Sequence, residues 1–471
     1  MRITLFLILV VLSSCGNLTD GGTTLTLLVS GKSVAYIPGS GPDDPSQLTY
    51  TIHGSGPGIL SKTVQGGGSI TLSLVPGNWT IQVTASYQGV PYAESKPQSI
   101  NVQAGGNNAA AIDMGSAWSA GNTEDFGGDP DEYKHFSASD ADSDLRYYLN
   151  TTAAGKKVAV IVDGTHTINP VTMSVAGTVI SLRGSGTIKL GSTNGSLFSA
   201  NAGATLILRG PNLVGRDNNN TVLVNINNSS LYMYAGEIRD NTNGGNISYG
   251  GGVYVGSTST FTMEGGSITH NIASSAPNFG NGGGVYVGSG GTFTMKGSAV
   301  ISRNISSIGY GGGVAVLGTT GTATFNMEGG TISNNESHVT GSNGGGGVFL
   351  SANSGSAIFT MSNGTISGNT AAAHGGGVNV GANGNFTMNG GAINGANTAI
   401  NGGGVFVVGI SGGSFTKSGG SIAGNTASGT GRAVYINGTT NKYRNVDAGP
   451  GDGITLSHAL TTPQDTPPWV D

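Results

Sequence analysis

Three carboxylates that lie close together in the sequence, Asp217, Glu237 and Asp240, are the residues best suited to acid–base chemistry. Hydrolysis of a glycosidic bond usually takes two carboxylates about 5–9 Å apart, one as the acid and the other as the base or nucleophile. The repeat pattern described below stacks successive turns, so it could bring Asp217 near Glu237 or Asp240. Turn and surface positions explain these acids more simply. We therefore keep them as candidates only for the case that the chain cleaves carbohydrate, and otherwise expect no catalytic residue.

The rest of the repeat region offers little to a catalyst or to a metal ion. Between Asp240 and Asp447 there is no aspartate, and the only acids are Glu264, Glu328 and Glu336. A calcium-dependent lyase needs a cluster of carboxylates together with a basic residue. The seven histidines are scattered and form no pair with the spacing of metal ligands. The glycine-rich runs also lack the Lys-Ser/Thr pair of a phosphate-binding loop. We expect neither an enzyme nor a bound metal or cofactor.

The composition indicates a β-rich protein that does not bind nucleic acid. Only 9% of the residues are charged and the net charge is -5, so there is no basic stripe for nucleic acid. Glycine is unusually frequent, with 86 residues in 471, but it lacks the three-residue period of collagen. Because 36% of the residues are hydrophobic, a disordered low-complexity chain is also excluded. Glycines in the turns between many short strands explain both numbers.

The segment that ends at Cys15 has the features of a processing signal. Arg2 precedes an apolar run from Ile3 to Leu12, which is too short to cross a bilayer. The run ends in Leu-Ser-Ser-Cys, which resembles the bacterial lipobox, and Cys15 is the only cysteine of the chain. The resemblance implies that Cys15 carries a covalent lipid that attaches the protein to a membrane. We expect an extracytoplasmic protein at the outer membrane or cell surface.

A Gly-Gly-Gly-Val unit recurs along the second half of the chain and marks an internal repeat. Its valines are Val253, Val285, Val314, Val348, Val378 and Val405, with a degenerate copy that ends at Val434. The successive spacings are 32, 29, 34, 30, 27 and 29 residues. Each repeat continues with a Phe-Thr-Met unit or a variant of it, and then with an Ile-x-x-Asn unit.

Each repeat therefore contains three short apolar strands separated by glycine-rich turns. A leucine-rich repeat would show a leucine framework, and a propeller blade would need about forty residues and four strands. Three strands in about thirty residues fit one triangular turn of a right-handed parallel β-helix, with turns about 4.8 Å apart. Phe, Val and Ile at fixed positions should then stack on their own copies in the core.

The asparagine of the Ile-x-x-Asn unit has two interpretations. It forms either an internal ladder of side-chain amides or a row of ligand-binding amides on the surface. Strict repetition beside isoleucine favours the ladder. Its members are Asn241, Asn271, Asn304, Asn335, Asn369 and Asn425. The fifth full repeat is irregular, because one extra residue separates Ile393 from Asn397.

The chain is predicted to be all-β and to consist of successive segments. Val75 to Ile81 resembles the Pro-Gly-x-aromatic turn of bacterial Ig-like and prealbumin-like modules, and this resemblance implies a small β-sandwich before the β-helix. The segments are a signal peptide (1–15), a tether (16–24), the β-sandwich (25–115), an acidic linker (116–136), a capping helix region (137–157), the parallel β-helix (158–445) and a C-terminal cap and tail (446–471).

The pairing of Gly-Gly-Gly-Val with Ile-x-x-Asn resembles the repeats of polymorphic outer-membrane proteins, whose hallmarks are Gly-Gly-Ala-aliphatic and Phe-x-x-Asn. It is closer still to repeat regions of bacterial surface lipoproteins with β-helix domains. The resemblance covers about residues 230–435 and implies surface display and adhesion rather than catalysis. This chain uses Gly for Ala and Ile for Phe, so adhesion does not carry over automatically. Lipid at Cys15 would replace the C-terminal outer-membrane barrel of that family as the anchor.

These observations predict a lipid-anchored, surface-displayed β-helix that acts as an adhesin or as a structural or interaction protein without catalysis. The expected partners are the membrane, through the lipid, and a host or bacterial surface protein or glycan. The alternative is a β-helix that binds or cleaves carbohydrate, similar to polysaccharide lyases and glycoside hydrolases.

Overall fold

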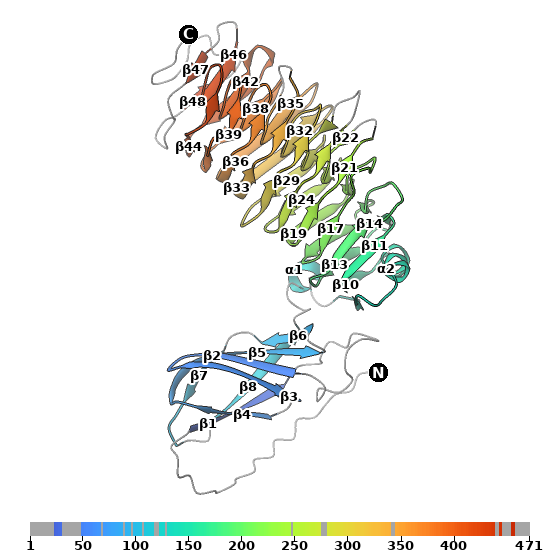
Figure 1. Cartoon of the computed structure of the whole chain (residues 1–471), viewed down its shortest axis with the longest axis vertical. Coiled ribbons are helices and arrows are strands. Elements are labelled where there is room, and N and C mark those ends of the chain that lie inside the picture. Colours follow the sequence, from blue (N-terminus) through green and yellow to red (C-terminus); the bar gives the residue numbers. More distant parts are fainter. Residues whose placement is uncertain are drawn as a thin grey trace. The chain divides into compact units, whose positions relative to one another are not determined.

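The structure is a computed structural model of the whole chain (Figure 1). It describes residues 23–30, 49–66, 69–87, 90–95, 98–105, 108–116, 122–127, 130–245, 248–274, 280–340, 344–438, 442–444 and 454–456. Cys15, the predicted signal peptide and most of the predicted tether lie outside these residues, as does the predicted tail 446–471 apart from 454–456. The chain divides into two compact units, residues 1–120 and 121–471, which are taken in turn.

The first unit is a β-sheet module whose strands pair in the order β3-β2-β5-β6-β8-β1-β4, with β7 on β5. The strands are β1 (Thr23–Ser30), β2 (Thr49–Ser55), β3 (Ile59–Gln65), β4 (Ser69–Leu74), β5 (Gly77–Tyr87), β6 (Val90–Ser95), β7 (Gln98–Val102) and β8 (Asn108–Ser116). Alternate residues of β1, β4 and β5 are buried, among them Leu27, Leu72 and Ile81. Trp79 is 3% exposed and donates through Nε1 to the carbonyl oxygen of Val75 at 2.9 Å. A β-sheet region is therefore present in the part of the chain where the sequence predicted a small β-sandwich.

The second unit is a parallel β-solenoid of about 10 turns between residues 132 and 437, which confirms the predicted all-β fold and parallel β-helix (Figure 1). Its widest sheet, called here the wide sheet, receives two strands from each turn. The first strands are β10 (Lys157–Val162), β13 (Val179–Arg183), β16 (Thr205–Arg209), β19 (Ser230–Ala235), β24 (Thr260–Met263), β29 (Thr292–Met295), β33 (Thr322–Ser333), β36 (Ser356–Ser367), β39 (Gly384–Met388) and β43 (Ser414–Lys417). The second strands are β11 (Thr165–Ile168), β14 (Thr187–Leu190), β17 (Asn212–Val214), β20 (Glu237–Arg239), β25 (Ser267–Thr269), β30 (Val300–Ser302), the later parts of β33 and β36, β40 (Ala392–Asn394) and β44 (Ser421–Ile422).

The Gly-Gly-Gly-Val units and the degenerate copy at Val434 begin seven strands of an eleven-stranded sheet, called here the valine sheet. Its strands are β12 (Val171–Met173), β15 (Phe198–Ala200), β18 (Val224–Ile226), β23 (Val253–Val255), β28 (Val285–Val287), β32 (Val314–Gly318), β35 (Val348–Ala352), β38 (Val378–Val380), β42 (Val405–Val408), β46 (Val434–Asn437) and β47 (Lys442–Arg444). The last of these, β47, pairs antiparallel with β46, and β48 (Ile454–Leu456) pairs antiparallel with β43. A 3-10 helix, Gly409–Ser411, follows β42.

A fourth parallel ladder, which the sequence pattern did not predict, follows the asparagines. Its two-residue strands are β21 (Thr242–Asn243), β26 (Ile272–Ala273), β31 (Ile305–Ser306), β34 (Glu336–Ser337), β37 (Thr370–Ala371), β41 (Thr398–Ala399) and β45 (Thr426–Ala427). The short strands β22 (Ser248–Tyr249) and β27 (Gly280–Asn281) pair beside it. Two residues are too few to show an apolar period, so only the register between turns reveals these strands.

The predicted linker over residues 116–136 extends too far, because the solenoid already begins at Glu132. A short helix, α1 (Asn122–Phe126), precedes β9 (Glu132–Phe136), which pairs in parallel with β10. One acid of this segment, Asp125, does not remain in solvent. Asp125 lies 2.8 Å from Arg183 and 2.7 Å from Arg209, and its side chain is fully buried. Acidic composition is typical of a solvated linker, but here arginines from later turns neutralise the charge.

A helical segment covers the first turns of the solenoid, within the predicted capping region 137–157. It consists of α2 (Asp142–Tyr147) and a π-helical turn (Tyr148–Thr152), which pack against β11 and β12. Leu145, Tyr148 and Leu149 point into the core and are at most 5% exposed. These side chains cover apolar groups that the first turn would otherwise leave open to water.

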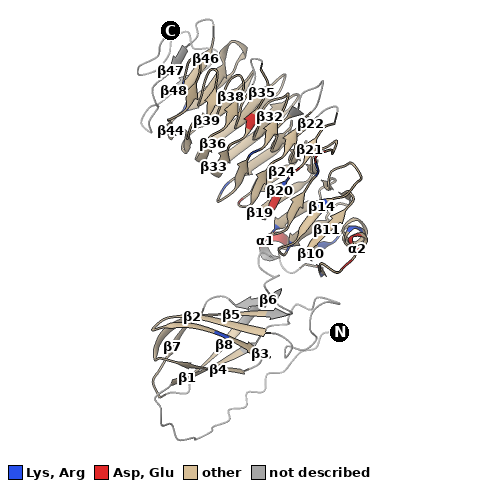
Figure 2. Ribbon diagram, in the orientation of Figure 1, with Lys and Arg blue, Asp and Glu red and all other residues tan. Residues whose placement is uncertain are grey.

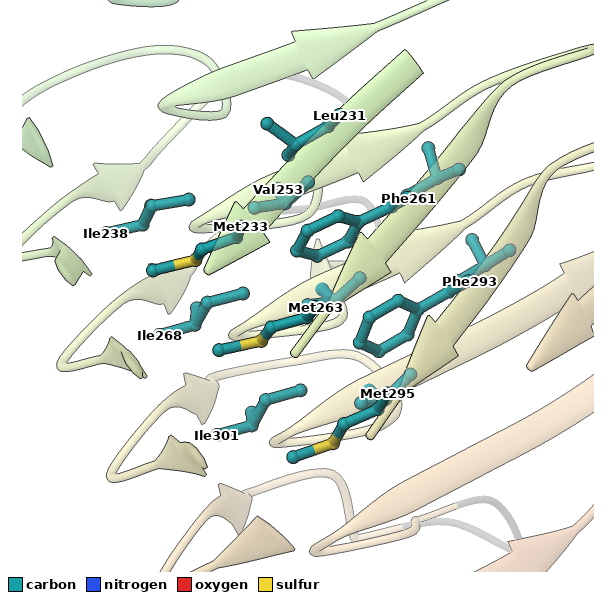
Figure 3. Packing of buried hydrophobic residues seen from close by; sticks show 14 of the residues in the cluster. Leu231, Met233, Ile238, Val253, Phe261, Met263, Ile268, Phe293, Met295 and Ile301 are labelled. Atoms are coloured by element: carbon teal, nitrogen blue, oxygen red, sulfur yellow. The ribbon is translucent and has the colours of Figure 1, made fainter. Parts of the chain in front are cut away.

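Identical side chains stack along the core of the solenoid, as the sequence predicts (Figure 3). The rings of Phe293, Phe325 and Phe359 lie 4.8 and 4.7 Å apart, which matches the rise between neighbouring parallel strands. Three further members, Phe261, Phe386 and Phe415, extend this stack. Methionine and isoleucine columns run beside it, and Figure 3 shows Met263 and Ile268 in register with Met295 and Ile301.

The glycine triplets bring the start of each valine-sheet strand close to the neighbouring turn. Gly282, the first of one triplet, has φ +69°, which L side chains rarely adopt. A Cβ on Gly283 would lie 2.4 Å from the carbonyl oxygen of Gly312 in the next turn. Both the left-handed backbone and the close approach therefore require glycine at this corner.

Candidate functional site

The six predicted ladder asparagines lie in one buried column beside the isoleucines. Asn304 is representative and is fully buried. Its Nδ2 donates to Oδ1 of Asn335 at 3.0 Å and to the carbonyl oxygen of Ile268 at 2.9 Å. Its Oδ1 accepts hydrogen bonds from the backbone N and the Nδ2 of Asn271 at 3.0 and 3.1 Å. These amides are occupied by the fold and are not available to an external ligand.

Asn397 completes the column between Asn369 and Asn425. It accepts from Nδ2 of Asn369 at 2.9 Å and donates to Oδ1 of Asn425 at 2.8 Å. The extra residue of this repeat is absorbed by the backbone before it, where Gly395 and Ala396 have φ of 63° and 62°. The ladder thus continues through the irregular repeat.

An open depression lies over the second strands of the wide sheet, on three consecutive turns. It is lined by Glu237, Arg239, Asp240, Ser267, Thr269, His270, Ser302 and Arg303. All of these side chains are polar, and each comes from β20, β25 or β30 or from the residue after that strand. Charged residues are sparse in the turns beyond it, where residues 337–416 contain no Lys, Arg, Asp or Glu (Figure 2).

Two of the three carboxylate candidates line this depression, and both pair with the guanidinium of Arg239. Nε of Arg239 lies 2.9 Å from Oε2 of Glu237, and Nη1 of Arg239 pairs with Oδ2 of Asp240. The side chains of Glu237 and Asp240 remain 42% and 39% exposed. Asp217 lies in an exposed turn after β17 and does not line the depression.

Hydroxyl groups from the following turns continue the polar lining. Ser267 donates through Oγ to Oε1 of Glu237 at 3.3 Å. The hydroxyl of Thr269 lies 3.0 Å from Nδ1 of His270 and 3.5 Å from the hydroxyl of Ser302. The strand register produces this contact, because Arg239 pairs with Thr269 and Thr269 pairs with Ser302.

The residue before the ladder asparagine has a left-handed backbone in each of these turns. Asp240, His270 and Arg303 have φ of 57°, 55° and 55°. The same position carries Asn334 and Gly368 in the next two turns, which are residue types that tolerate this conformation. A left-handed backbone costs most other L residues about 1–2 kcal/mol. Histidine also tolerates this conformation, so Arg303 is the residue that holds backbone strain at this polar surface.

Arg303→Asn is expected to stabilise the chain by about 1 kcal/mol, because asparagine relieves the left-handed strain. Urea unfolding measures the difference between the variant and the wild-type chain. Lys189→Asn is the matched control. Lys189 is an exposed residue of β14 with an extended backbone, and it lies two turns before Arg239 in the same column of paired residues. Equal changes in the two variants would show that loss of charge, and not relief of strain, sets the stability.

His270 and Arg303 escaped the sequence analysis because they are far apart in the chain and belong to different repeats. The signal was the residue directly before each ladder asparagine, where later repeats have Asn, Gly or Ala. A large or charged residue at that position marks a turn whose backbone is strained. The carboxylates Glu237 and Asp240 were named, but the cation that joins them was not assigned that role.

Comparison of the chain with protein-family models, with curated proteins and with solved structures gave no match. Within the described residues, no helix is long and apolar enough to span a membrane. The same part of the chain contains no group of three His, Cys, Asp or Glu side chains placed to hold a metal ion.

Proposed function

We propose that this chain is a lipid-anchored β-helix displayed at the outer membrane or cell surface, where it binds a host or bacterial surface partner without catalysis. The observation that carries this proposal is the polar depression, whose two carboxylates share Arg239. Side chains that are partly exposed and already hydrogen-bonded suit recognition of a polar surface. The anchor is supported by Cys15 and the lipobox that precedes it.

The geometry of the acids favours binding over bond cleavage. Glycosidic hydrolysis needs an acid and a base or nucleophile that face the same bond, with substrate or water between them. In the depression, the guanidinium of Arg239 contacts both Glu237 and Asp240. Arg239 holds one oxygen of each carboxylate, so the two acids face one cation instead of a bond that lies between them, and their remaining exposed surface is left for binding.

The contrast between interior and exterior also supports a display role. From β20 onward, the inward residue of the second strand is an isoleucine in every turn, whereas the outward residue changes from turn to turn. The outward residues in register are Glu237, Ser267, Val300, Thr331 and Thr365. A constant interior lets the exterior vary without loss of the fold, which suits a scaffold for recognition.

Three of the loops that precede the glycine triplets are held against the outer face of the valine sheet by aromatic pairs. In each pair, the residue directly before a triplet stacks on the outward residue of the valine-sheet strand that belongs to the next turn. The pairs are Tyr249 on Tyr286 at 5.1 Å, Tyr310 on Phe349 at 4.6 Å and His374 on Phe406 at 4.4 Å. Loops pinned in this way lose less entropy when they bind a partner.

A carbohydrate-cleaving protein is the second candidate, because Glu237, Asp240 and His270 share one depression. Incubation with polysaccharides and measurement of new reducing ends distinguishes the two functions. We expect no product from the wild-type chain. Product formation that is lost in both Glu237→Gln and Asp240→Asn would establish the second candidate instead.

The anchor is tested by growing cells that express the chain with an alkyne-labelled fatty acid. We expect the label on the wild-type chain, which sediments with membranes, because acylation at Cys15 provides stable attachment. Cys15→Ser should carry no label and should leave the membrane fraction. An unlabelled wild-type chain, or equal labelling of the variant, would contradict the lipid anchor.

A further inference from the structure

Arg303 is the cation of the depression that no acid neutralises. Arg239 pairs with Glu237 and Asp240, and Lys296 pairs with Glu264 at 2.8 Å. The guanidinium of Arg303 takes part in no ion pair with any residue that the structure describes, and it is exposed. A guanidinium is a planar fork of donors that matches an oxyanion.

Donors for an oxyanion line the depression together with Arg303, on its own turn and on the previous one. Ser302 directly precedes it, and Thr269 and His270 lie at the equivalent positions one turn earlier. Successive turns are about 4.8 Å apart, so the imidazole and the guanidinium project from neighbouring positions along the axis. The left-handed backbone shared by His270 and Arg303 places both residues at the same corner of their turns.

The opposite end of the depression is an acceptor surface. Glu237 and Asp240 keep 42% and 39% of their side chains exposed although both contact Arg239. Carboxylate oxygens accept hydrogen bonds from hydroxyl groups. No aliphatic or aromatic side chain is among the described residues that line the depression, so an apolar ligand would gain little burial there.

We propose that this depression binds a saccharide that carries one oxyanion, with the anion on Arg303 and the sugar hydroxyls on Glu237 and Asp240. This inference rests on the proposed binding function and names the ligand class of that site. A densely charged polyanion is disfavoured, because the two carboxylates would repel it over the rest of its length. A neutral saccharide would leave the Arg303 guanidinium without its oxyanion.

Three saccharides with a common core test the proposal by titration calorimetry on the purified full-length chain in detergent. They are lactose, which is neutral, sialyllactose, which adds a carboxylate, and sulfated lactose, which adds a sulfate. We expect both acidic forms to bind at least about tenfold more tightly than lactose, because a hydrogen bond to a charged group is stronger than a neutral one. The two acidic forms show whether a carboxylate or a sulfate is preferred.

Arg303→Asn should weaken the binding of the acidic saccharides about ten- to a hundredfold, toward that of lactose. Because Asn334 occupies the same left-handed position one turn later, this variant keeps the local backbone, and unfolding does not explain the loss. Lys189→Asn, which removes a cation outside the depression, should bind like the wild-type chain. Unchanged binding by Arg303→Asn, equal binding of lactose, or no binding of any of the three would overturn the proposal. None of these results bears on acylation of Cys15, which tests the anchor separately.

Discussion

Asn304→Ala is expected to destabilise the solenoid by about 3–5 kcal/mol, because it leaves several buried polar groups without a partner. The carbonyl oxygen of Ile268 loses its donor, and the backbone N of Asn271 loses its acceptor. Asn335 loses the donor side chain that faces its Oδ1. Each orphaned group costs about 1–3 kcal/mol, and water cannot reach a column that is fully buried.

Urea unfolding together with amide hydrogen exchange measures this effect, since a repeat array need not unfold in one step. We expect faster exchange in the turns on either side of Asn304. Asn326→Ala is the matched control, because Asn326 is an outward, partly exposed residue of β33. Its effect should stay within about 0.5 kcal/mol. Equal unfolding free energies of the two variants would show that the asparagine column does not stabilise the stacking of the turns.

Asp125→Ala is expected to cost about 3–5 kcal/mol as well, because it removes the acid that Arg183 and Arg209 share, and only Arg209 keeps a second acid, Glu124. The Asp125 side chain is fully buried, and those of Arg183 and Arg209 are 4% and 17% exposed. Burial already lowers the pKa of Arg183, and Asp125 opposes that shift through its hydrogen bond and its charge. Without Asp125, the charge of Arg183 would remain buried with no counterion.

Glu124→Ala is the control for Asp125→Ala in the same helix. Glu124 contacts Arg209 at 2.5 Å, but 52% of its side chain is exposed. Solvent screening limits such a pair to about 0–1 kcal/mol. Thermal unfolding should therefore separate the two variants clearly. A small effect of Asp125→Ala would mean that α1 is only loosely attached to the solenoid.

The fold could be predicted from the sequence because each turn of the solenoid repeats the same pattern of apolar residues. Phe, Ile and Val recur at fixed places in each turn. This recurrence is visible in the sequence because each of these side chains stacks on the same residue type in the next turn. The features that were missed depend on contacts between distant residues. Asp125 pairs with Arg183, which is 58 residues away, so its local composition was typical of a linker instead.

The candidate site was predictable only in part, for a related reason. Glu237 and Asp240 were visible as acids on either side of Arg239 in the sequence. His270 and Arg303 join them through the register of three turns, and no spacing along the chain reveals that register. Asn397 was left out of the ladder because one inserted residue broke the Ile-x-x-Asn spacing, although the backbone accommodates it.

The central claim, that the solenoid is displayed at the cell surface, is tested most directly by an amine-reactive reagent that does not cross membranes. Lys189 and Lys296 are suitable targets, since Lys189 is exposed and the Lys296 side chain is 40% exposed. The reagent is applied to intact and to lysed cells, and mass spectrometry measures the labelling of these two lysines. Surface display predicts equal labelling in both samples. Labelling that appears only after lysis would contradict it.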